Sequence, residues 1–155
     1  MSEPRVFATV FAQTDLGRTR DHNEDTFLIA DLSARSVCAL EGTTEHAVGP
    51  RGCLFLVADG MGGAAAGEVA SAMAAEAIAE HLLGAWSGVD DDSPEHFAEH
   101  LREAVERAND QLHAYAQGHP EVRGMGTTAT VAGLFEGALY LAQVGDSRAY
   151  LTRGG

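Results

Sequence analysis

The chain has 155 residues, 45% of them hydrophobic, which is enough for one core and too few for two ordinary domains. Twenty-three acidic residues against ten Lys and Arg give a formal net charge of -13, which argues against binding to nucleic acid or an anionic membrane surface. The sequence predicts no signal peptide and no membrane span, so a cytoplasmic protein with reduced thiols at Cys38 and Cys53 is expected.

The first half of the chain predicts three strands. Residues 6–13 and 26–30 are rich in β-branched and aromatic residues, and a polar loop separates them. Residues 31–52 are polar and irregular, which is typical of a long loop or a distorted hairpin, and an apolar strand follows at 53–58. That strand runs straight into Asp59, and a carboxylate at the end of a buried strand needs a positive charge nearby.

The second half predicts two helices followed by three strands. Apolar residues recur at helical spacing over residues 66–83, a charged linker follows at 88–92, and Ser93 with Pro94 is a typical start for a second helix ending near 118–120. The strand-like runs, joined by turns at 136–137 and 145–147, are residues 127–135, 138–144 and 149–152. Because strands and helices are segregated, the sequence predicts an α+β fold with a mostly antiparallel sheet.

The polar loop before the second strand contains the first motif with chemical potential, Arg-Asp-His-Asn-Glu-Asp at residues 20–25. Arg20 offers a planar donor fork that matches phosphate oxygens, and Glu24 and Asp25 offer hard oxygen ligands for Mg²⁺ or Mn²⁺. The structural alternative is a solvated polar loop with a surface salt bridge.

Two further carboxylates lie where strands end. Asp59 is followed by three glycines in residues 60–63, where the backbone can approach a metal and offer the Gly60 carbonyl; a turn with a helix cap is the alternative. Asp146 follows an apolar strand in Gly-Asp-Ser-Arg at residues 145–148, with a tight Asx-type turn as the alternative. Carboxylates at three such junctions of one small domain favour a site for several metal ions.

Four ordered motifs resemble those of the bacterial metal-dependent protein Ser/Thr phosphatases, the type 2C or PPM family. They occupy residues 20–25, residues 59–63 with 67–71, residues 125–128 and residues 145–148, and the resemblance runs from about residue 12 to residue 153. It implies one domain over residues 1–155, built as a four-layer α-β-β-α sandwich of two mostly antiparallel sheets flanked by helix pairs. It also implies hydrolysis of phosphoserine and phosphothreonine by a metal-activated water.

The resemblance implies a site for two Mn²⁺ or Mg²⁺ ions and a third, weaker one. Asp59 resembles the carboxylate that bridges two metals, and Glu24 and the Gly60 carbonyl resemble the other ligands of one of them. Asp146 resembles a ligand of the third metal.

The same resemblance assigns the remaining roles. Asp25 resembles the partner of metal-bound waters, and Arg20 resembles the clamp on the phosphate of a phosphorylated protein, with a Ser/Thr kinase pathway as a candidate setting. Some relatives have a His after Asp-Gly as the general acid, but this chain has Met61 there, and His22 is only a weak candidate.

The family pattern continues into further strands, a Ser-Asp-Gly motif and a late Asp-Asn motif, none of which follows Gly155 in this sequence. The resemblance therefore implies a catalytic domain truncated at its C-terminus, with an open sheet edge. The alternative function is a catalytically defective fragment that binds phosphoproteins or acts as a regulatory pseudo-phosphatase.

Two other patterns are interpreted as coincidental. Residues 60–65 formally match a dinucleotide-binding fingerprint, but a helix rather than a parallel strand is expected after the first helix. His96, Glu99 and His100 match an inverted zinc-protease pattern, and a solvated helix face is the expected reading.

Overall fold

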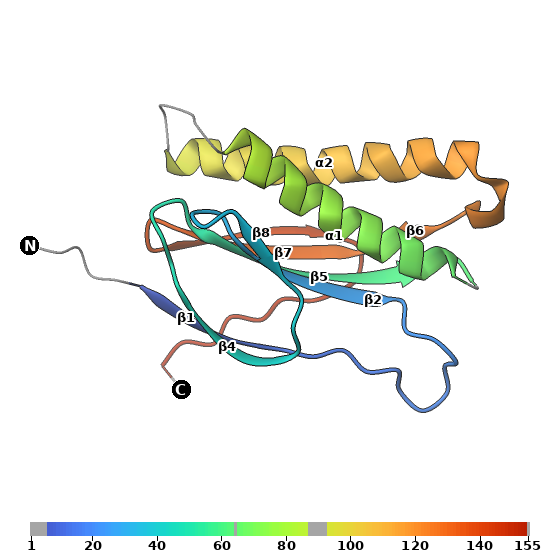
Figure 1. Cartoon of the computed structure of the whole chain (residues 1–155), viewed down its shortest axis with the longest axis horizontal. Coiled ribbons are helices and arrows are strands. Elements are labelled where there is room, and N and C mark those ends of the chain that lie inside the picture. Colours follow the sequence, from blue (N-terminus) through green and yellow to red (C-terminus); the bar gives the residue numbers. More distant parts are fainter. Residues whose placement is uncertain (1–5, 64, 87–92, 155) are drawn as a thin grey trace, which may run out of the picture.

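The chain forms two antiparallel sheets, with two helices packed on the larger one (Figure 1). The structure is a computed structural model and describes residues 6–63, 65–86 and 93–154. The larger sheet has the strand order β3-β2-β5-β7-β8, with β6 paired to β5. Its strands are β2 (Asp25–Asp31), β3 (Ser36–Cys38), β5 (Cys53–Met61), β6 (Gly126–Thr127), β7 (Ala129–Phe135) and β8 (Ala138–Val144), and the smaller sheet pairs β1 (Phe7–Ala12) with β4 (Gly42–Ala47).

Helices α1 (Ala66–Ala85) and α2 (Pro94–Gly118) cover one face of the larger sheet, and the small sheet lies on its other side (Figure 1). A short 3-10 helix, η1 (Pro120–Val122), follows α2. The Ser93 side chain accepts a hydrogen bond from the His96 amide, as the predicted N-cap requires. The described residues therefore form three layers in the order α-β-β; the second helix layer implied by the family resemblance is not among them.

The core lies between α1, α2 and the larger sheet. Helix α1 buries mainly alanines, so it approaches both the sheet and α2 closely, while larger side chains fill the space near its C-terminal end. There Trp86 packs edge-on against Phe97 and Phe135, whose rings stack on each other with centroids 5.1 Å apart. This aromatic group fixes the end of α1 against α2 and β7.

The predicted strands at 6–13, 26–30, 53–58 and 138–144 and both predicted helices are confirmed. The turn at Glu136 and Gly137 is also confirmed, because both residues have positive φ, as a tight hairpin turn requires. The irregular segment 31–52 contains β3, which forms a hairpin with β2, and β4, which pairs with β1. The polar composition of β4, Gly-Thr-Thr-Glu-His-Ala, hides this strand from an analysis of apolar runs.

Three predictions about the strands differ from the structure, one in the existence of a strand and two in its bounds. Residues 149–152 form no strand, since no neighbouring strand pairs with them, and Tyr150 and Leu151 are exposed. The run 127–135 is interrupted at Thr128, where pairing to β5 breaks into two short ladders. Strand β5 continues through Asp59 to Met61 instead of turning at the carboxylate.

The remaining predictions concern the two cysteines, the absence of a membrane span and the linker. Cys38 and Cys53 are both free, as expected, and burial raises the pKa of Cys53 to about 11, which makes it an unreactive thiol. Among the described residues, no helix is both long and apolar enough to cross a membrane. The predicted linker at 88–92 lies outside the described residues.

Candidate metal centre

Asp25 and Asp59 lie directly opposite each other on neighbouring antiparallel strands. Asp25 is the first residue of β2, and its backbone partner in the β2–β5 ladder is Asp59. Opposed residues of an antiparallel pair project their side chains to the same face, with Cβ atoms about 5 Å apart. The sheet therefore brings together two carboxylates that are 34 residues apart in sequence (59 − 25).

The electrostatics of this pair favour a bound cation. Burial raises the pKa of Asp25, and the charge of Asp59 and a hydrogen bond between the two side chains raise it further, while Arg20 acts in the opposite direction. Like charges directly opposite on a sheet repel each other and destabilise it. A divalent ion between the carboxylates removes this repulsion, so the pair fits the hard oxygen ligands that Mn²⁺ and Mg²⁺ prefer.

Glu24 is buried beside the pair, and its Oε1 atom has no hydrogen-bond partner. Arg20 Nη1 lies 3.5 Å from Oε2, and His22 Nε2 lies 3.6 Å from Oε1. Neither is a close charge-assisted hydrogen bond, which is normally shorter than about 3 Å. An orphaned buried carboxylate oxygen is what a metal-ligand role for Glu24 would leave in a metal-free structure.

The glycines at 60 and 67 let β2, β5 and the first turn of α1 approach each other. A Cβ on Gly60 would lie 1.9 Å from the Gly67 carbonyl oxygen, and a Cβ on Gly67 would lie 2.6 Å from the Glu24 carboxylate. The Gly60 amide donates to the Glu24 carbonyl at 3.1 Å. These glycines are therefore explained by close packing around Glu24, a reason that the sequence pattern alone did not reveal.

The loop before β2 is shaped by Asn23. Its side-chain amide donates to the Thr14 hydroxyl at 2.7 Å, and its Oδ1 accepts from the Asp25 amide at 3.0 Å. These two hydrogen bonds fix the backbone just before β2, where Asp25 pairs with Asp59. The Arg20 side chain extends from the same loop and is 71% exposed, so its guanidinium is available to a ligand in solvent.

Thr128 connects Asp59 to the loop after β8. Its hydroxyl accepts from the Asp59 amide at 3.0 Å and lies 2.6 Å from the Ser147 hydroxyl, and its own amide donates to the Asp59 carbonyl at 2.9 Å. Thr128 belongs to the motif at residues 125–128, for which the sequence predicts no individual role. Thr128 lies at the break between β6 and β7, next to Ser147, and this position reveals its role beside Asp59.

Asp146 is exposed in that same loop. A cavity of about 250 Å³ is lined by Asp25, Asp59 and Ser147, but not by Asp146. The structure thus brings the Gly-Asp-Ser-Arg loop to the pair through Ser147. It does not place the Asp146 carboxylate in the cavity.

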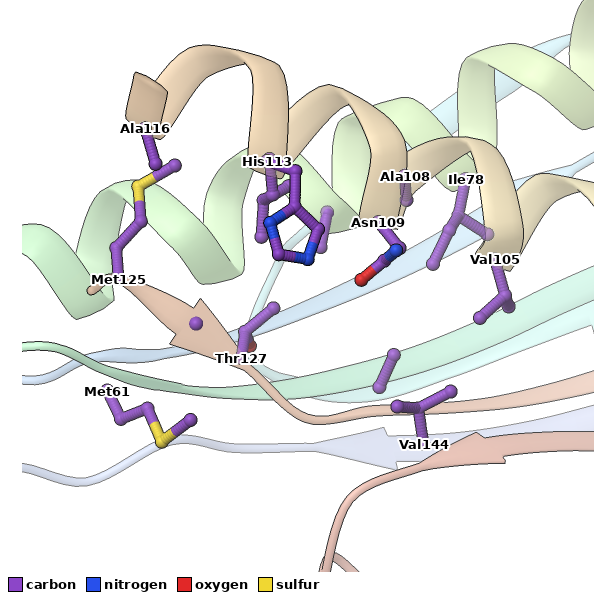
Figure 2. A pocket seen from close by; sticks show the side chains of 14 residues that line it. Met61, Ile78, Val105, Ala108, Asn109, His113, Ala116, Met125, Thr127 and Val144 are labelled. Atoms are coloured by element: carbon purple, nitrogen blue, oxygen red, sulfur yellow. The ribbon is translucent and has the colours of Figure 1, made fainter. Parts of the chain in front are cut away.

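A second cavity, of about 260 Å³, lies between the two helices and β6. Figure 2 shows Asn109 and His113 pointing into it from α2, with Met61, Met125 and Thr127 on the opposite side. Its lining is mainly apolar and contains none of the carboxylates. The cavity beside Asp25 and Asp59 is therefore the better candidate for phosphoryl chemistry.

The two patterns interpreted as coincidental are also resolved. All strand pairs of the larger sheet are antiparallel, so residues 60–65 do not belong to a dinucleotide-binding unit. Glu99 is exposed on α2, but His100 is only 23% exposed and lies beside Glu103 and His81 instead. The expectation of a solvated face is therefore wrong for His100.

Comparison with known proteins decides the family. The family model described as protein phosphatase 2C matches residues 18–155. The chain belongs to the protein phosphatase 2C family. It contains the segment with Arg20, Glu24 and Asp25 as well as the segments with Asp59 and Asp146 within the matched range.

Several bacterial members of the protein phosphatase 2C family are similar to this chain. The serine/threonine protein phosphatase PstP of Mycobacterium tuberculosis is 42% identical over 131 residues, which are 83% of this chain and 24% of PstP. The serine/threonine phosphatase stp of Listeria monocytogenes is 34% identical over 140 residues, which are 90% of this chain and 48% of stp. The chain therefore spans about half the length of stp, or less for PstP.

Solved structures of the family have the same fold. The PstP catalytic domain in complex with two manganese ions matches with a TM-score of 0.60 and 32% identity, over 93% of this chain and 49% of that structure. The Streptococcus agalactiae serine/threonine phosphatase matches with a TM-score of 0.70 and 25% identity, over 92% of this chain and 50% of that structure. A relative of this chain thus binds two manganese ions.

Proposed function

We propose that this chain supplies metal ligands and a phosphate-binding arginine to the catalytic centre of a protein Ser/Thr phosphatase that depends on Mn²⁺ or Mg²⁺. The observation that carries the proposal is the register that sets Asp25 opposite Asp59, two carboxylates whose repulsion a divalent cation removes. The proposal places residues 1–155 in one catalytic domain of a cytoplasmic protein. Its substrates are proteins that carry phosphoserine or phosphothreonine, in the setting of a Ser/Thr kinase pathway.

Different residues of this chain are proposed as ligands of different ions. Asp59 is proposed to bridge two metals, with Glu24 and the Gly60 carbonyl as further ligands of one and Asp25 as the partner of water in the centre. Asp146 is proposed to serve a third, weaker ion from the loop after β8. The two manganese ions of the PstP structure support this number for the main centre.

When bound, the ions would lower the pKa of a water, so that it could lose a proton near neutral pH and serve as the nucleophile toward phosphorus. Thr128 holds the backbone of Asp59 on both sides, through the Asp59 amide and carbonyl, and so fixes the direction of its carboxylate. Asn23 holds the start of β2 through the Asp25 amide, which donates to its Oδ1. These contacts orient the carboxylates in advance, which reduces the rearrangement that ion binding requires.

Arg20 is proposed to bind the phosphoryl oxygens. Its guanidinium is exposed, stands beside the buried Glu24 and presents a planar donor fork. A chain with a formal net charge of -13 repels a phosphorylated peptide, so a cation at the site is needed to admit it. Arg20 together with the bound ions offsets that repulsion.

A second candidate function is a phosphoprotein-binding or regulatory module without catalysis. It is favoured by the arrangement of the described carboxylates, because Asp25 and Asp59 share a cavity while Asp146 does not line it and Glu24 packs toward α1. Arg20 would then hold a phosphoryl group that is not hydrolysed.

The two functions are tested by hydrolysis and binding of one phosphothreonine peptide. We expect Mn²⁺-dependent hydrolysis that falls more than about a hundredfold in Asp59→Asn, because a bridging ligand is lost. Asp110→Asn, an exposed change on α2, is the matched control and leaves hydrolysis unchanged. Hydrolysis that Asp59→Asn does not alter contradicts the phosphatase proposal, whereas peptide binding that is weakened by Arg20→Lys, without any hydrolysis, supports the second candidate.

A further inference from the structure

Helices α1 and α2 bring two histidines and a glutamate together on the side of the molecule away from the candidate metal centre. His81 lies on α1, and His100 and Glu103 lie on α2. Their donor atoms all lie within 4.8 Å of one another. Glu103 Oε2 is 3.6 Å from His81 Nε2 and also 3.6 Å from His100 Nδ1.

The two histidine nitrogens are buried and have no hydrogen-bond partner. The side chains of His81 and His100 are 13% and 23% exposed, while that of Glu103 is 47% exposed. A separation of 3.6 Å is too long for a hydrogen bond, and burying a polar nitrogen without a partner costs about 1–3 kcal/mol. Two such nitrogens facing one carboxylate present three donor atoms to the same point between the helices.

Two imidazoles and one carboxylate form a donor set suited to zinc. Imidazole binds borderline ions such as Zn²⁺ and Co²⁺, whereas Mn²⁺ and Mg²⁺ prefer oxygen ligands. Two ligands of a tetrahedral zinc ion, each about 2.0–2.1 Å from the metal, lie about 3.4 Å apart. The two separations from Glu103 Oε2, each 3.6 Å, are close to this value, and the two histidine nitrogens lie within 4.8 Å of each other.

We propose that His81, His100 and Glu103 form a second metal site, for Zn²⁺ or an ion of similar chemistry, that cross-links α1 to α2. Three protein ligands leave the fourth position of a tetrahedral ion to water, on the side where Glu103 reaches solvent. His81 lies 14 residues along α1 from Gly67, or about 21 Å at 1.5 Å per residue. The site is therefore separate from the carboxylates around Asp59.

The surroundings hold the ligands in place. The His100 ring contacts Trp86 edge-on with centroids 5.7 Å apart, and Trp86 is fixed in turn by its Nε1 donating to the Arg51 carbonyl at 3.0 Å. On α2, His100 and Glu103 are three residues apart and so lie on one helix face.

The charges around His81 act in both directions. Burial lowers the pKa of His81, which keeps the imidazole in the neutral form that binds metals; Arg107 and His100 also lower it, and Glu103 raises it. Arg107 also repels a bound cation, and Glu103 attracts one. The competing explanation of the cluster is an ion pair between protonated histidines and Glu103, without any metal.

The test uses Co²⁺ and the single tryptophan of the chain, Trp86. Because Trp86 contacts His100, a Co²⁺ ion bound at the site quenches Trp86 fluorescence and gains visible ligand-field absorption. With saturating Mg²⁺ present to fill the carboxylate centre, we expect quenching that saturates at one ion per chain and is reversed by Zn²⁺. Zn²⁺ is also expected to raise the melting temperature, since it binds only the folded chain's assembled ligands.

Substitution of the proposed ligands tests whether Co²⁺ binds at this cluster. Glu103→Gln and His81→Gln are each expected to weaken Co²⁺ binding about tenfold or more, whereas Glu99→Gln, an exposed change on the same helix, leaves it unchanged. Glu103 is partly exposed, so its substitution tests the ligand without depending on a buried residue. Absence of saturable quenching, or quenching equal in Glu103→Gln and wild type, overturns the proposal and leaves the ion pair.

Discussion

The two clusters of this chain that suit metals differ in chemistry and in how the fold assembles them. Asp25 and Asp59 offer only oxygen atoms and are brought together by strand register. His81, His100 and Glu103 offer mainly nitrogen and are brought together by the packing of two helices. The sheet thus presents donors that suit hard ions such as Mn²⁺, and the helix pair presents donors that suit Zn²⁺.

The difference also concerns how tightly each site is built. Around Glu24 the glycines leave no room for a side chain, so the carboxylate centre depends on close backbone contacts. The histidine cluster depends on side chains of α1 and α2 that meet where the two helices pack together. Changes near the first site are therefore expected to disturb the fold, while changes at the second mainly remove a ligand.

The largest expected effect comes from Gly60→Ala. Its Cβ would lie 1.9 Å from the Gly67 carbonyl oxygen, so β5 and α1 must separate, and we expect a loss of stability of more than about 3 kcal/mol. Gly84→Ala, in the last turns of α1, has nothing within 4 Å of the added Cβ and is expected to raise stability by about 0.5–1 kcal/mol. Urea unfolding of both variants measures the contrast. Equal free energies of unfolding for the two variants would contradict the tight packing around Glu24.

Thr128→Val is expected to have the next largest effect. It removes the hydroxyl that accepts from the Asp59 amide and contacts Ser147, and the loss of one such solvent-accessible hydrogen bond costs about 0.5–1.5 kcal/mol. We also expect about a tenfold loss of phosphatase activity, because the Asp59 carboxylate is less well oriented. Thr43→Val, on the exposed face of β4, is the control. An activity loss in both variants alike would argue against an orienting role for Thr128.

The smallest expected effect is a gain in stability from Asp25→Asn without metal. Because burial and Asp59 raise the pKa of Asp25, its ionised form is disfavoured in the folded chain, and Asn removes that penalty. The side chain is largely solvated, so we expect at most about 0.5 kcal/mol at neutral pH. The gain should vanish at a pH low enough to protonate Asp25 in both the folded and unfolded chain. Thermal unfolding in EDTA measures it, and a loss of stability at neutral pH would contradict the repulsion between the two carboxylates.

The carboxylate centre was largely predictable from the sequence, and the histidine cluster was not. Asp59 follows an apolar strand, and Glu24 and Asp25 precede one, so local patterns predict that these three lie at strand ends once the strands are recognised. The pairing of Asp25 with Asp59 needed the register of β2 on β5, which no local pattern specifies.

The histidine cluster depends on how α1 rotates and packs against α2. His81 and His100 are 19 residues apart in different helices (100 − 81), and the inverted zinc-protease pattern pointed to Glu99 instead of Glu103. The strand expected at 149–152 failed for a related reason, since an apolar run becomes a strand only where a neighbouring strand receives its hydrogen bonds.

The most direct test of two separate metal sites is a titration of both ions against both substitutions. Calorimetry follows Mn²⁺, and Trp86 fluorescence follows Co²⁺ in saturating Mg²⁺, in wild type, Asp59→Asn and Glu103→Gln. We expect Asp59→Asn to weaken Mn²⁺ binding and to leave the quenching by Co²⁺ intact. We expect Glu103→Gln to weaken the quenching by Co²⁺ and to leave Mn²⁺ binding intact. Mn²⁺ binding that is unchanged in Asp59→Asn, or loss of both ions in either variant, would contradict the proposal of two separate metal sites.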